Sequence, residues 1–322
     1  MKPTIALLYG GYSSEFEVSV KSAANVYSVI DKDKYDIRKV LVSREQWTVV
    51  VDEDTLPIDK TDFTYIYKGV KCNFDLALIM IHGDPGENGL LQAYFELIGQ
   101  KYLGCSFLVS ALVFDKYICK SYLRDTRVSV AKDILVRKGD RVDAEKVVEE
   151  LKLPIFVKPN SGGSSFGITK VKQASDLDAA LDYAFGEGET VILEEAIVGR
   201  EITCGVFSVG GKCVTLPPTE IISDNEYFDY QAKYEGASKE VCPADISEEM
   251  ADLISQTTSE IYHFMGCKGL VRMDYIVRED EVFFLEINPI PGMTHASLVP
   301  QQLRTAHIDV RELYSAMIED AL

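Results

Sequence analysis

The feature that most constrains the fold is an apolar strand that runs into a glycine turn and then into a helical pattern. Residues 4–9 form the apolar segment, Gly10 and Gly11 open the turn, and the helical pattern covers residues 15–30. Residues 35–42 and 74–81 have the composition of further strands, the second of them buried. Strands that alternate with helices favour a parallel sheet covered by helices, so we expect an α/β fold, in part α+β.

The rest of the chain divides into further predicted units. The first unit ends with a helix at 90–97 and a strand at 101–103. Helices are then expected at 110–124, 138–150 and 176–183, with strands at 154–158, 168–171 and 191–194. The last part is expected to hold strands at 201–209, 270–277 and 282–288 and a helix at 247–265, and it closes with a segment at 297–304 and a C-terminal helix. We therefore predict three domains, over residues 1–106, 107–193 and 194–322.

Composition excludes several classes of protein. The chain has 33 Lys and Arg against 51 Asp and Glu, a net charge of -18. A field of that sign repels nucleic acid and anionic membranes, so neither is expected as a partner. No apolar run approaches the ~20 residues of a membrane helix. The first apolar run, near the N-terminus, is too short for a signal peptide. Seven scattered cysteines predict reduced thiols, so we expect a cytoplasmic enzyme.

Two late strands carry polar side chains at alternating positions. Arg272 and Asp274 share one face of the first strand, and Glu286 and Asn288 share one face of the second. A loop with an odd number of residues would place Asp274 opposite Glu286, where like charges repel. A divalent cation would remove that repulsion, and these oxygen ligands suit Mg²⁺. The alternative is a solvated hairpin face, unless a phosphate binds nearby.

A glycine- and serine-rich loop supplies a candidate phosphate site. Residues 158–167 read Lys-Pro-Asn-Ser-Gly-Gly-Ser-Ser-Phe-Gly. Glycines let backbone amides approach a phosphate, while Ser161, Ser164 and Ser165 add donors and Lys158 adds charge. A strand follows rather than a helix, so this is not a P-loop, and we expect a hairpin flap over phosphates. A plain surface loop is the alternative.

These motifs together resemble the ATP-grasp ligases, specifically the D-alanine–D-alanine ligase family. The resemblance rests on the loop at 158–167, on Glu-Ile-Asn-Pro-Ile-Pro-Gly-Met-Thr at 286–294, and on His-Gly-Asp-Pro-Gly-Glu-Asn-Gly at 82–89. Further matches lie at 10–19, 115–116, 194–197, 199–201 and 227–234. It implies a Rossmann-like N-terminal domain followed by two domains whose antiparallel sheets sandwich ATP.

The resemblance also implies a reaction. Two D-alanines are joined to D-alanyl-D-alanine for peptidoglycan precursors, while ATP becomes ADP and phosphate. The first D-alanine carboxylate becomes an acyl phosphate, which the amine of the second attacks, so water must be excluded. Two Mg²⁺ ions are implied as cofactors, for which Mn²⁺ can substitute, and a homodimer is expected.

The resemblance assigns a role to each matching residue. Nucleotide contacts are implied for Lys116, Lys158, Ser164, Ser165, Glu194, Glu195, Ile197, Glu201 and Lys233. Metal ligands are implied at Asp274, Glu286 and Asn288. Substrate or catalytic contacts are implied for Glu15, His82, Arg272, Gly292, Ser297 and Leu298, with Ser164 and Tyr234 closing a lid over the site. The lid is expected within residues 223–241, and Lys233-Tyr234 favours dipeptide over depsipeptide formation.

Individually, several of these residues have plainer interpretations. Glu15 fits a first-turn helix acid, His82 a core histidine, and Arg272 a salt-bridge partner of Asp274. Three places depart from the family pattern: Phe16 stands where a polar residue is expected, Pro289-Ile290-Pro291 is more rigid, and His295-Ala296 reverses the usual order. The alternatives are another ATP-grasp carboxylate–amine ligase, or an inactive nucleotide-binding homologue.

Overall fold

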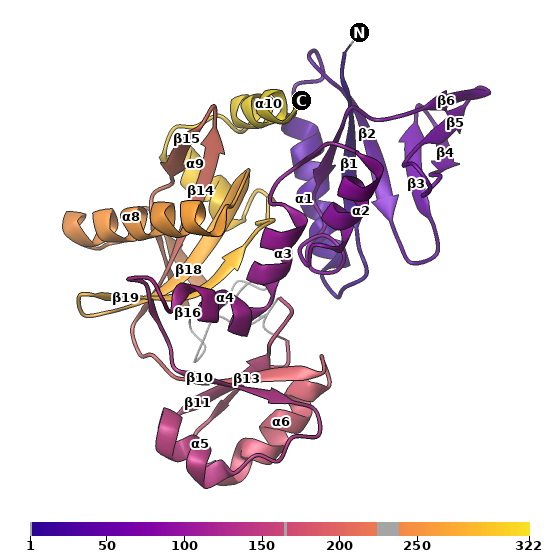
Figure 1. The fold of residues 1–322 in the computed structure, drawn as a ribbon. Helices are drawn as coiled ribbons and strands as arrows, with labels where there is room; N and C mark the ends of the chain where they lie inside the picture. Colours follow the sequence, from indigo (N-terminus) through magenta and orange to yellow (C-terminus); the bar gives the residue numbers. More distant parts are fainter. Residues whose placement is uncertain (1, 164–165, 224–237) are drawn as a thin grey trace.

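The described residues form three large β-sheets and one two-stranded hairpin, and three hydrophobic clusters pack against the large sheets (Figure 1). The computed structural model describes residues 2–163, 166–223 and 238–322. Within these ranges, no helix is both long and apolar enough to cross a membrane. The expected α/β architecture is confirmed, and the sheets differ in the direction of their strands.

The first sheet has a parallel centre, as predicted. β1 (Thr4–Gly10) lies between β2 (Asp36–Val42) and β7 (Leu76–Ile79), and both pair with it in parallel. β8 (Tyr102–Leu103) extends the parallel part beside β7. The other edge was not predicted, because β3 (Trp47–Val51) and β4 (Asp54–Pro57) add to it as antiparallel strands.

Helices of this first part follow the predicted pattern. α1 (Phe16–Val29) and α2 (Leu90–Ile98) form close to their predicted bounds. The small hairpin of β5 (Tyr65–Tyr67) and β6 (Val70–Cys72) was not predicted. α10 (Val310–Ala321), from the far end of the chain, adds Leu313, Tyr314 and Ile318 to the core of the first sheet. The two ends of the chain therefore share one core.

The second and third sheets are essentially antiparallel. The second has the order β10 (Asp133–Arg137), β13 (Thr190–Glu195), β11 (Ile155–Pro159), β12 (Thr169–Val171) and carries α5 (Ala144–Leu151), the 3-10 helix η1 (Ala174–Asp176) and α6 (Leu177–Phe185). The third has the order β17 (Ser238–Val241), β16 (Thr219–Ser223), β14 (Arg200–Val209), β18 (Leu270–Arg278), β19 (Glu281–Asn288), β9 (Ser129–Val130), with β15 (Lys212–Thr215) beside β14. Helices α8 (Glu248–Met265) and α9 (Leu298–Thr305) complete this part.

The domain boundaries at 106 and 193 stay a prediction. β9 lies before residue 193 but pairs in parallel with β19 of the third sheet. The segment between the first and second sheets also packs on the core of the third, through Val109, Val113 and Leu123. The division of the chain into sheets is therefore not simply sequential.

The predicted helix at 110–124 is wrong in one respect, because it is broken. α3 (Phe107–Phe114) ends and α4 (Lys116–Leu123) begins at Asp115, whose backbone is extended (φ -87°, ψ 104°). The Asp115 carboxylate accepts a hydrogen bond from the Ile118 amide at 2.8 Å, which caps α4. Asp115 also bridges to Ser161 of the glycine-serine loop. The break thus directs the start of α4 at that loop.

The register of β18 and β19 agrees with the prediction but has another cause. Asp274 does lie opposite Glu286. The turn, however, has an even number of residues, because Arg278 pairs with Glu281. An irregularity between Asp274 and Tyr275 shifts the register by one, since Tyr275 pairs with Phe284. A β-bulge in β19, rather than an odd loop, therefore brings the two carboxylates together.

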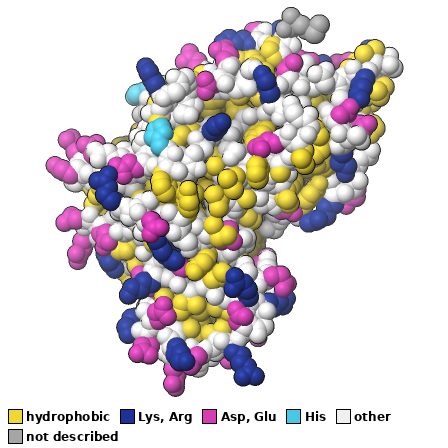
Figure 2. All heavy atoms as spheres, viewed as in Figure 1, with side chains coloured by type: hydrophobic (Ala, Val, Ile, Leu, Met, Phe, Trp, Pro, Cys, Tyr) yellow, Lys and Arg dark blue, Asp and Glu magenta, His cyan; other side chains and the backbone are white. Residues whose placement is uncertain are grey.

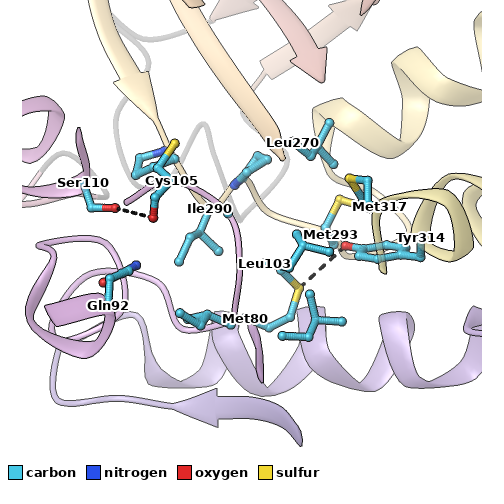
Figure 3. Close-up of a pocket in the computed structure, with 15 residues that line it drawn as sticks. Met80, Gln92, Leu103, Cys105, Ser110, Leu270, Ile290, Met293, Tyr314 and Met317 are labelled. Atoms are coloured by element: carbon cyan, nitrogen blue, oxygen red, sulfur yellow. Dashed lines mark hydrogen bonds between the residues drawn. The ribbon is translucent and has the colours of Figure 1, made fainter. Parts of the chain in front are cut away.

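The loop after β19 is held by the core of the first sheet. Ile290 and Met293 are buried there, beside Met80 and Tyr314, as Figure 3 shows. The Tyr314 hydroxyl hydrogen-bonds the Met80 sulfur at 3.8 Å. Only a small cavity of about 30 Å³ remains between these side chains. Packing on both sides therefore fixes the backbone that carries Gly292.

Candidate active site

A cleft of about 340 Å³ lies where the first and third sheets meet the glycine-serine loop. It collects many of the predicted site residues from distant parts of the chain: Glu15, His82, Lys116, Arg272, Glu286, Asn288, Gly292, Ser297 and Leu298. Glu87 and Glu240 also line it and were not predicted as site residues. Ser164, Ser165, Lys233 and Tyr234 lie outside the described residues, so their roles stay predictions.

Glu15 lies at the start of α1 and is almost buried. Its carboxylate meets the backbone of the glycine-serine loop, since a Cβ on Gly163 would come within 2.9 Å of both its oxygens. A Cβ on Gly83 would come within 2.8 Å of one of them. A side chain at either position would displace the carboxylate from this place, so the acid is packed into the cleft rather than exposed as a simple helix-start charge.

His82 is buried with both ring nitrogens in hydrogen bonds. Nδ1 contacts the Ile290 carbonyl oxygen and Nε2 contacts the Ser22 hydroxyl, each at 3.0 Å. Burial lowers the pKa of the imidazole, so the ring is neutral at pH 7. Nδ1–H therefore donates to Ile290 and Nε2 accepts from Ser22, whose oxygen accepts from the Met293 amide at 3.2 Å. The histidine orients the loop around Gly292, and a direct substrate contact stays a prediction.

Glu87 is the second buried acid of this region. One carboxylate oxygen accepts from the Gly83 amide at 2.8 Å. Burial, followed by the nearby charge of Glu15, raises the pKa of Glu87 to about 8. Membership of the 82–89 motif was the one feature of the sequence that could have indicated a site role for Glu87. Nothing in its spacing indicated that it is buried.

We predict that Glu87 makes stability fall with pH. Between pH 4.5 and about 8, the folded protein keeps a proton that the unfolded chain has lost, so unfolding becomes easier as pH rises. Glu87→Gln keeps an acceptor for the Gly83 amide but removes the titration. Urea unfolding at a series of pH values should show a flatter profile in this variant. The exposed Glu17→Gln serves as control, and a Glu87→Gln profile identical to wild type would contradict the prediction.

The third sheet carries the candidate metal ligands. Arg272 donates to both Asp274 oxygens at 2.9 and 2.8 Å, and the Asn288 amide nitrogen donates to Asp274 at 3.0 Å. Lys116 forms an ion pair with Glu286 at 3.3 Å. Two cations therefore lie beside these acids, Arg272 on the sheet itself and Lys116 at the start of α4.

The chemistry of the donors fits Mg²⁺. Among the described residues, no cluster of three His, Cys, Asp or Glu side chains could hold a metal alone. Two carboxylates and one amide on adjacent strands form a partial oxygen set, and Mg²⁺ commonly completes such a set with substrate phosphates and water.

Lys116 also ties the glycine-serine loop to the cleft. Its ammonium donates to the Gly162 carbonyl at 2.8 Å, and its amide donates to the Asn160 carbonyl at 3.0 Å. The Tyr117 amide donates to the Asn160 side chain at 2.9 Å. The backbone at 160–162 is therefore anchored to α4, rather than being an independent surface loop.

The other predicted nucleotide residues lie on the second sheet, just after it, or at the start of the third sheet. Glu194 and Glu195 end β13, Ile197 follows them, and Glu201 lies at the start of β14. Lys158 on β11 contacts the Glu194 carboxylate directly. Burial, and then the charge of Lys120, lowers the pKa of Lys158 well below its usual range.

A buried ion cluster extends from Glu194, and three of its members, Lys120, Arg124 and Asp133, were not predicted as site residues. Lys120 contacts Glu194 and lies 3.0 Å from an Asp133 oxygen, while Arg124 contacts the other Asp133 oxygen. Burial lowers the pKa of Lys120 to about 8. In the sequence, the position of Lys120 four residues after Lys116 on one predicted helix indicated that the two lysines share a face. Asp133 had no signal, because β10 was not predicted.

Two antiparallel sheets beside a parallel α/β part, with carboxylates and lysines between them, define the ATP-grasp class of fold. Residues 4–105 match the family described as the D-ala D-ala ligase N-terminus, and residues 123–319 match the D-ala D-ala ligase C-terminus. The chain belongs to the D-alanine–D-alanine ligase family.

Individual relatives cover the chain end to end. It is 51% identical to a D-alanine–D-alanine ligase of Parabacteroides distasonis, over 100% of this chain and 98% of that protein. The corresponding enzyme of Phocaeicola vulgatus is 47% identical over 99% of each chain.

Solved structures agree in fold. The VanG D-Ala:D-Ser ligase of Enterococcus faecalis has a TM-score of 0.90 at 31% identity, covering 100% of both chains. The ATP complex of a Bacillus anthracis D-alanine–D-alanine ligase has a TM-score of 0.80 at 27% identity, covering 99% of this chain and 97% of that one.

Proposed function

We propose that the protein is an ATP-dependent ligase that joins two D-alanines to D-alanyl-D-alanine, forming ADP and phosphate, for peptidoglycan precursors. The observation that supports this best is the composition of the cleft. An anion for a substrate ammonium (Glu15), a cation for a phosphoryl group (Arg272) and a helix start for a carboxylate (Ser297) line one cavity. These three anchors suit two amino acids flanking a phosphoryl group.

The side chains divide the work along the cleft. Glu15 binds the ammonium of the first D-alanine and so directs its carboxylate toward the phosphate region. Attack of that carboxylate on the γ-phosphorus of ATP breaks the bond to ADP and forms an acyl phosphate. Arg272 and the Gly292 amide stabilise charge on the transferring group and on the later oxyanion. The amine of the second D-alanine then attacks the carbonyl carbon, and phosphate leaves.

The second substrate is held by the start of α9. Ser297 occupies the N-cap position of this helix without a side-chain capping bond, and its hydroxyl lies 2.7 Å from that of Thr294. The free amides and dipole of a helix N-terminus favour a carboxylate. The Ser297 hydroxyl and the Leu298 amide are therefore our candidates for binding the second carboxylate.

Asp274, Glu286 and Asn288 would hold two Mg²⁺ ions. Bound there, the ions would neutralise charge on the phosphates. Arg272 and Lys116 already lie beside these acids, so the chain's own cations and carboxylates alternate at the phosphate end of the cleft.

The second substrate is the feature that needs a direct test, because one structural neighbour is a D-Ala:D-Ser ligase. The protein should be incubated with ATP and D-alanine, alone and with D-serine or D-lactate, and products identified by mass. D-Alanyl-D-alanine should dominate at neutral pH. Dominant D-alanyl-D-serine would make D-serine the second substrate, and dominant D-alanyl-D-lactate would make it a depsipeptide ligase. ATP use independent of any D-amino acid would favour a different ATP-grasp ligase, and no ATP use with any of these substrates would favour an inactive homologue.

We further propose a homodimer in the cytoplasm, where ATP is available. Exposed apolar side chains gather on helices α2 and α3: Leu90, Leu97, Phe107 and Leu108. Figure 2 shows hydrophobic side chains on the face that carries these helices. Such a patch is typical of a subunit interface. Leu97→Glu with Leu108→Glu should convert a dimer to a monomer in sedimentation, and an unchanged sedimentation coefficient would exclude this face.

A further inference from the structure

Gln302 is a fully buried polar residue in the middle of α9. Its Oε1 accepts from the Gly205 amide at 3.0 Å. Its Nε2 donates to the Thr203 carbonyl oxygen at 3.0 Å and to the Thr219 hydroxyl at 3.1 Å. The side chain of one helix thus forms three hydrogen bonds to the third sheet.

These bonds fill a gap in the sheet. Along its outer edge β14 pairs with β16 at residues 201–203 and with β15 at residues 206–209. Where the partner changes, the Gly205 amide and the Thr203 carbonyl bond to the Gln302 amide as they would to a strand. The approach requires glycine, because a Cβ on Gly205 would lie 2.7 Å from Gln302 Oε1. The glutamine and the glycine therefore form one docking point.

The docking point also touches the phosphate end of the cleft. The Thr203 hydroxyl donates to an Asp274 oxygen at 2.6 Å, while the Thr203 carbonyl accepts from Gln302. One residue therefore orients a candidate metal ligand and holds α9. At the start of α9, a Cβ on Gly292 would lie only 3.0 Å from the Ser297 hydroxyl. A small rotation or shift of the helix would change that contact.

We propose that Gln302 is a positioning residue for the second substrate: it fixes the rotation and depth of α9, so that Ser297 and the Leu298 amide face the carboxylate of that substrate. The proposal rests on the proposed function. Gln301, the next residue toward the N-terminus, differs, because it contacts Glu240 of β17 and the Ala296 carbonyl and is only partly buried. Of these two neighbouring glutamines, Gln302 is the one that joins α9 to the centre of the sheet.

The test compares three variants. Gln302→Met keeps the volume but removes all three hydrogen bonds. Thr219→Val removes one of these hydrogen bonds, and it replaces Gln302→Met as the test variant if Gln302→Met does not fold. Thr258→Val is the matched control, because it removes a buried hydroxyl in α8 that bonds Ile254 and Tyr275, neither of which belongs to α9. Dipeptide formation is measured against D-alanine concentration, and hydrogen exchange is followed in residues 298–305.

Gln302→Met should raise the D-alanine concentration needed for half-maximal dipeptide formation by about tenfold, with a smaller loss in kcat, because misplaced binding groups weaken capture. Thr219→Val should shift it in the same direction by less. Exchange in residues 298–305 should rise in both variants and stay unchanged in Thr258→Val. Equal D-alanine dependence in wild type and in whichever of Gln302→Met and Thr219→Val folds overturns the proposal. A wild type that forms no dipeptide overturns the proposed function instead.

Discussion

Replacing Glu286 by glutamine is expected to lower turnover by about a hundredfold or more, the size seen when a preorganised electrostatic group is removed from an active site. Glu286 lies opposite Asp274 on the adjacent strand and lines the cleft. The amide is neutral and a weaker oxygen ligand for Mg²⁺, so the charge of the phosphates would be less well compensated. Turnover should also need more magnesium to reach half its maximum.

The fold should be nearly unaffected. The side chains of Glu286 and Lys116 are 28% and 11% exposed, and loss of such a partly solvated pair costs about 1 kcal/mol or less. Glu281→Gln, at the exposed end of the same strand, is the control. Nucleotide affinity by calorimetry provides a measurement independent of turnover. Near-normal turnover of Glu286→Gln at the magnesium level of the wild type would remove Glu286 from the metal site.

Local patterns in the sequence predicted the elements that surround this site. Alternating side chains placed Arg272 with Asp274 on one strand, and the helical pattern of α1 put Glu15 at its start. The paired position of Glu286 was also predicted, although from an odd loop that does not exist. A two-residue turn and a bulge produce the same pairing, and neither has a strong signal in a single sequence.

Contacts between distant segments could not be predicted from local patterns. Burial of Lys120 depends on Asp133 and Glu194, which lie on two strands of another sheet. The break between α3 and α4 at Asp115 depends on a bridge to Ser161, which lies far along the chain in the glycine-serine loop. Gln302 reads as an ordinary helix residue, and only the change of partner along β14 gives it a role.

Replacing Glu194 by glutamine is expected to destabilise the protein by about 3–5 kcal/mol at neutral pH, the usual cost of leaving a buried charge without its partner. Glu194 lies between Lys120 and Lys158, and all three side chains are largely buried. Glutamine keeps the shape but leaves the amino groups of Lys120 and Lys158 facing each other without a carboxylate between them. Asp133 then remains as the acid beside Lys120, and Arg124 shares it.

The same cluster determines how this loss depends on pH. The folded-state pKa of Lys120 is about 8 and that of Lys158 is also lowered, against an ordinary value of 10.5. Above these folded values the unfolded chain binds more protons than the folded one, so stability rises with pH up to about the ordinary value. Removal of the Glu194 charge lowers both pKa values further. The loss of unfolding free energy in Glu194→Gln, relative to wild type, should therefore be largest at or below neutral pH and shrink toward high pH.

Urea unfolding across this pH range, with two further variants, would test the charge argument. Glu195→Gln is the matched control, because Glu195 ends the same strand but accepts a hydrogen bond from the exposed Lys132 amide, which glutamine can also accept. It should cost little at any pH. Adding Lys120→Met to Glu194→Gln removes one of the two facing amino groups, so the double variant should be more stable than Glu194→Gln alone. If the double variant is less stable, or if the deficit of Glu194→Gln does not change with pH, repulsion between buried lysines is not the cause.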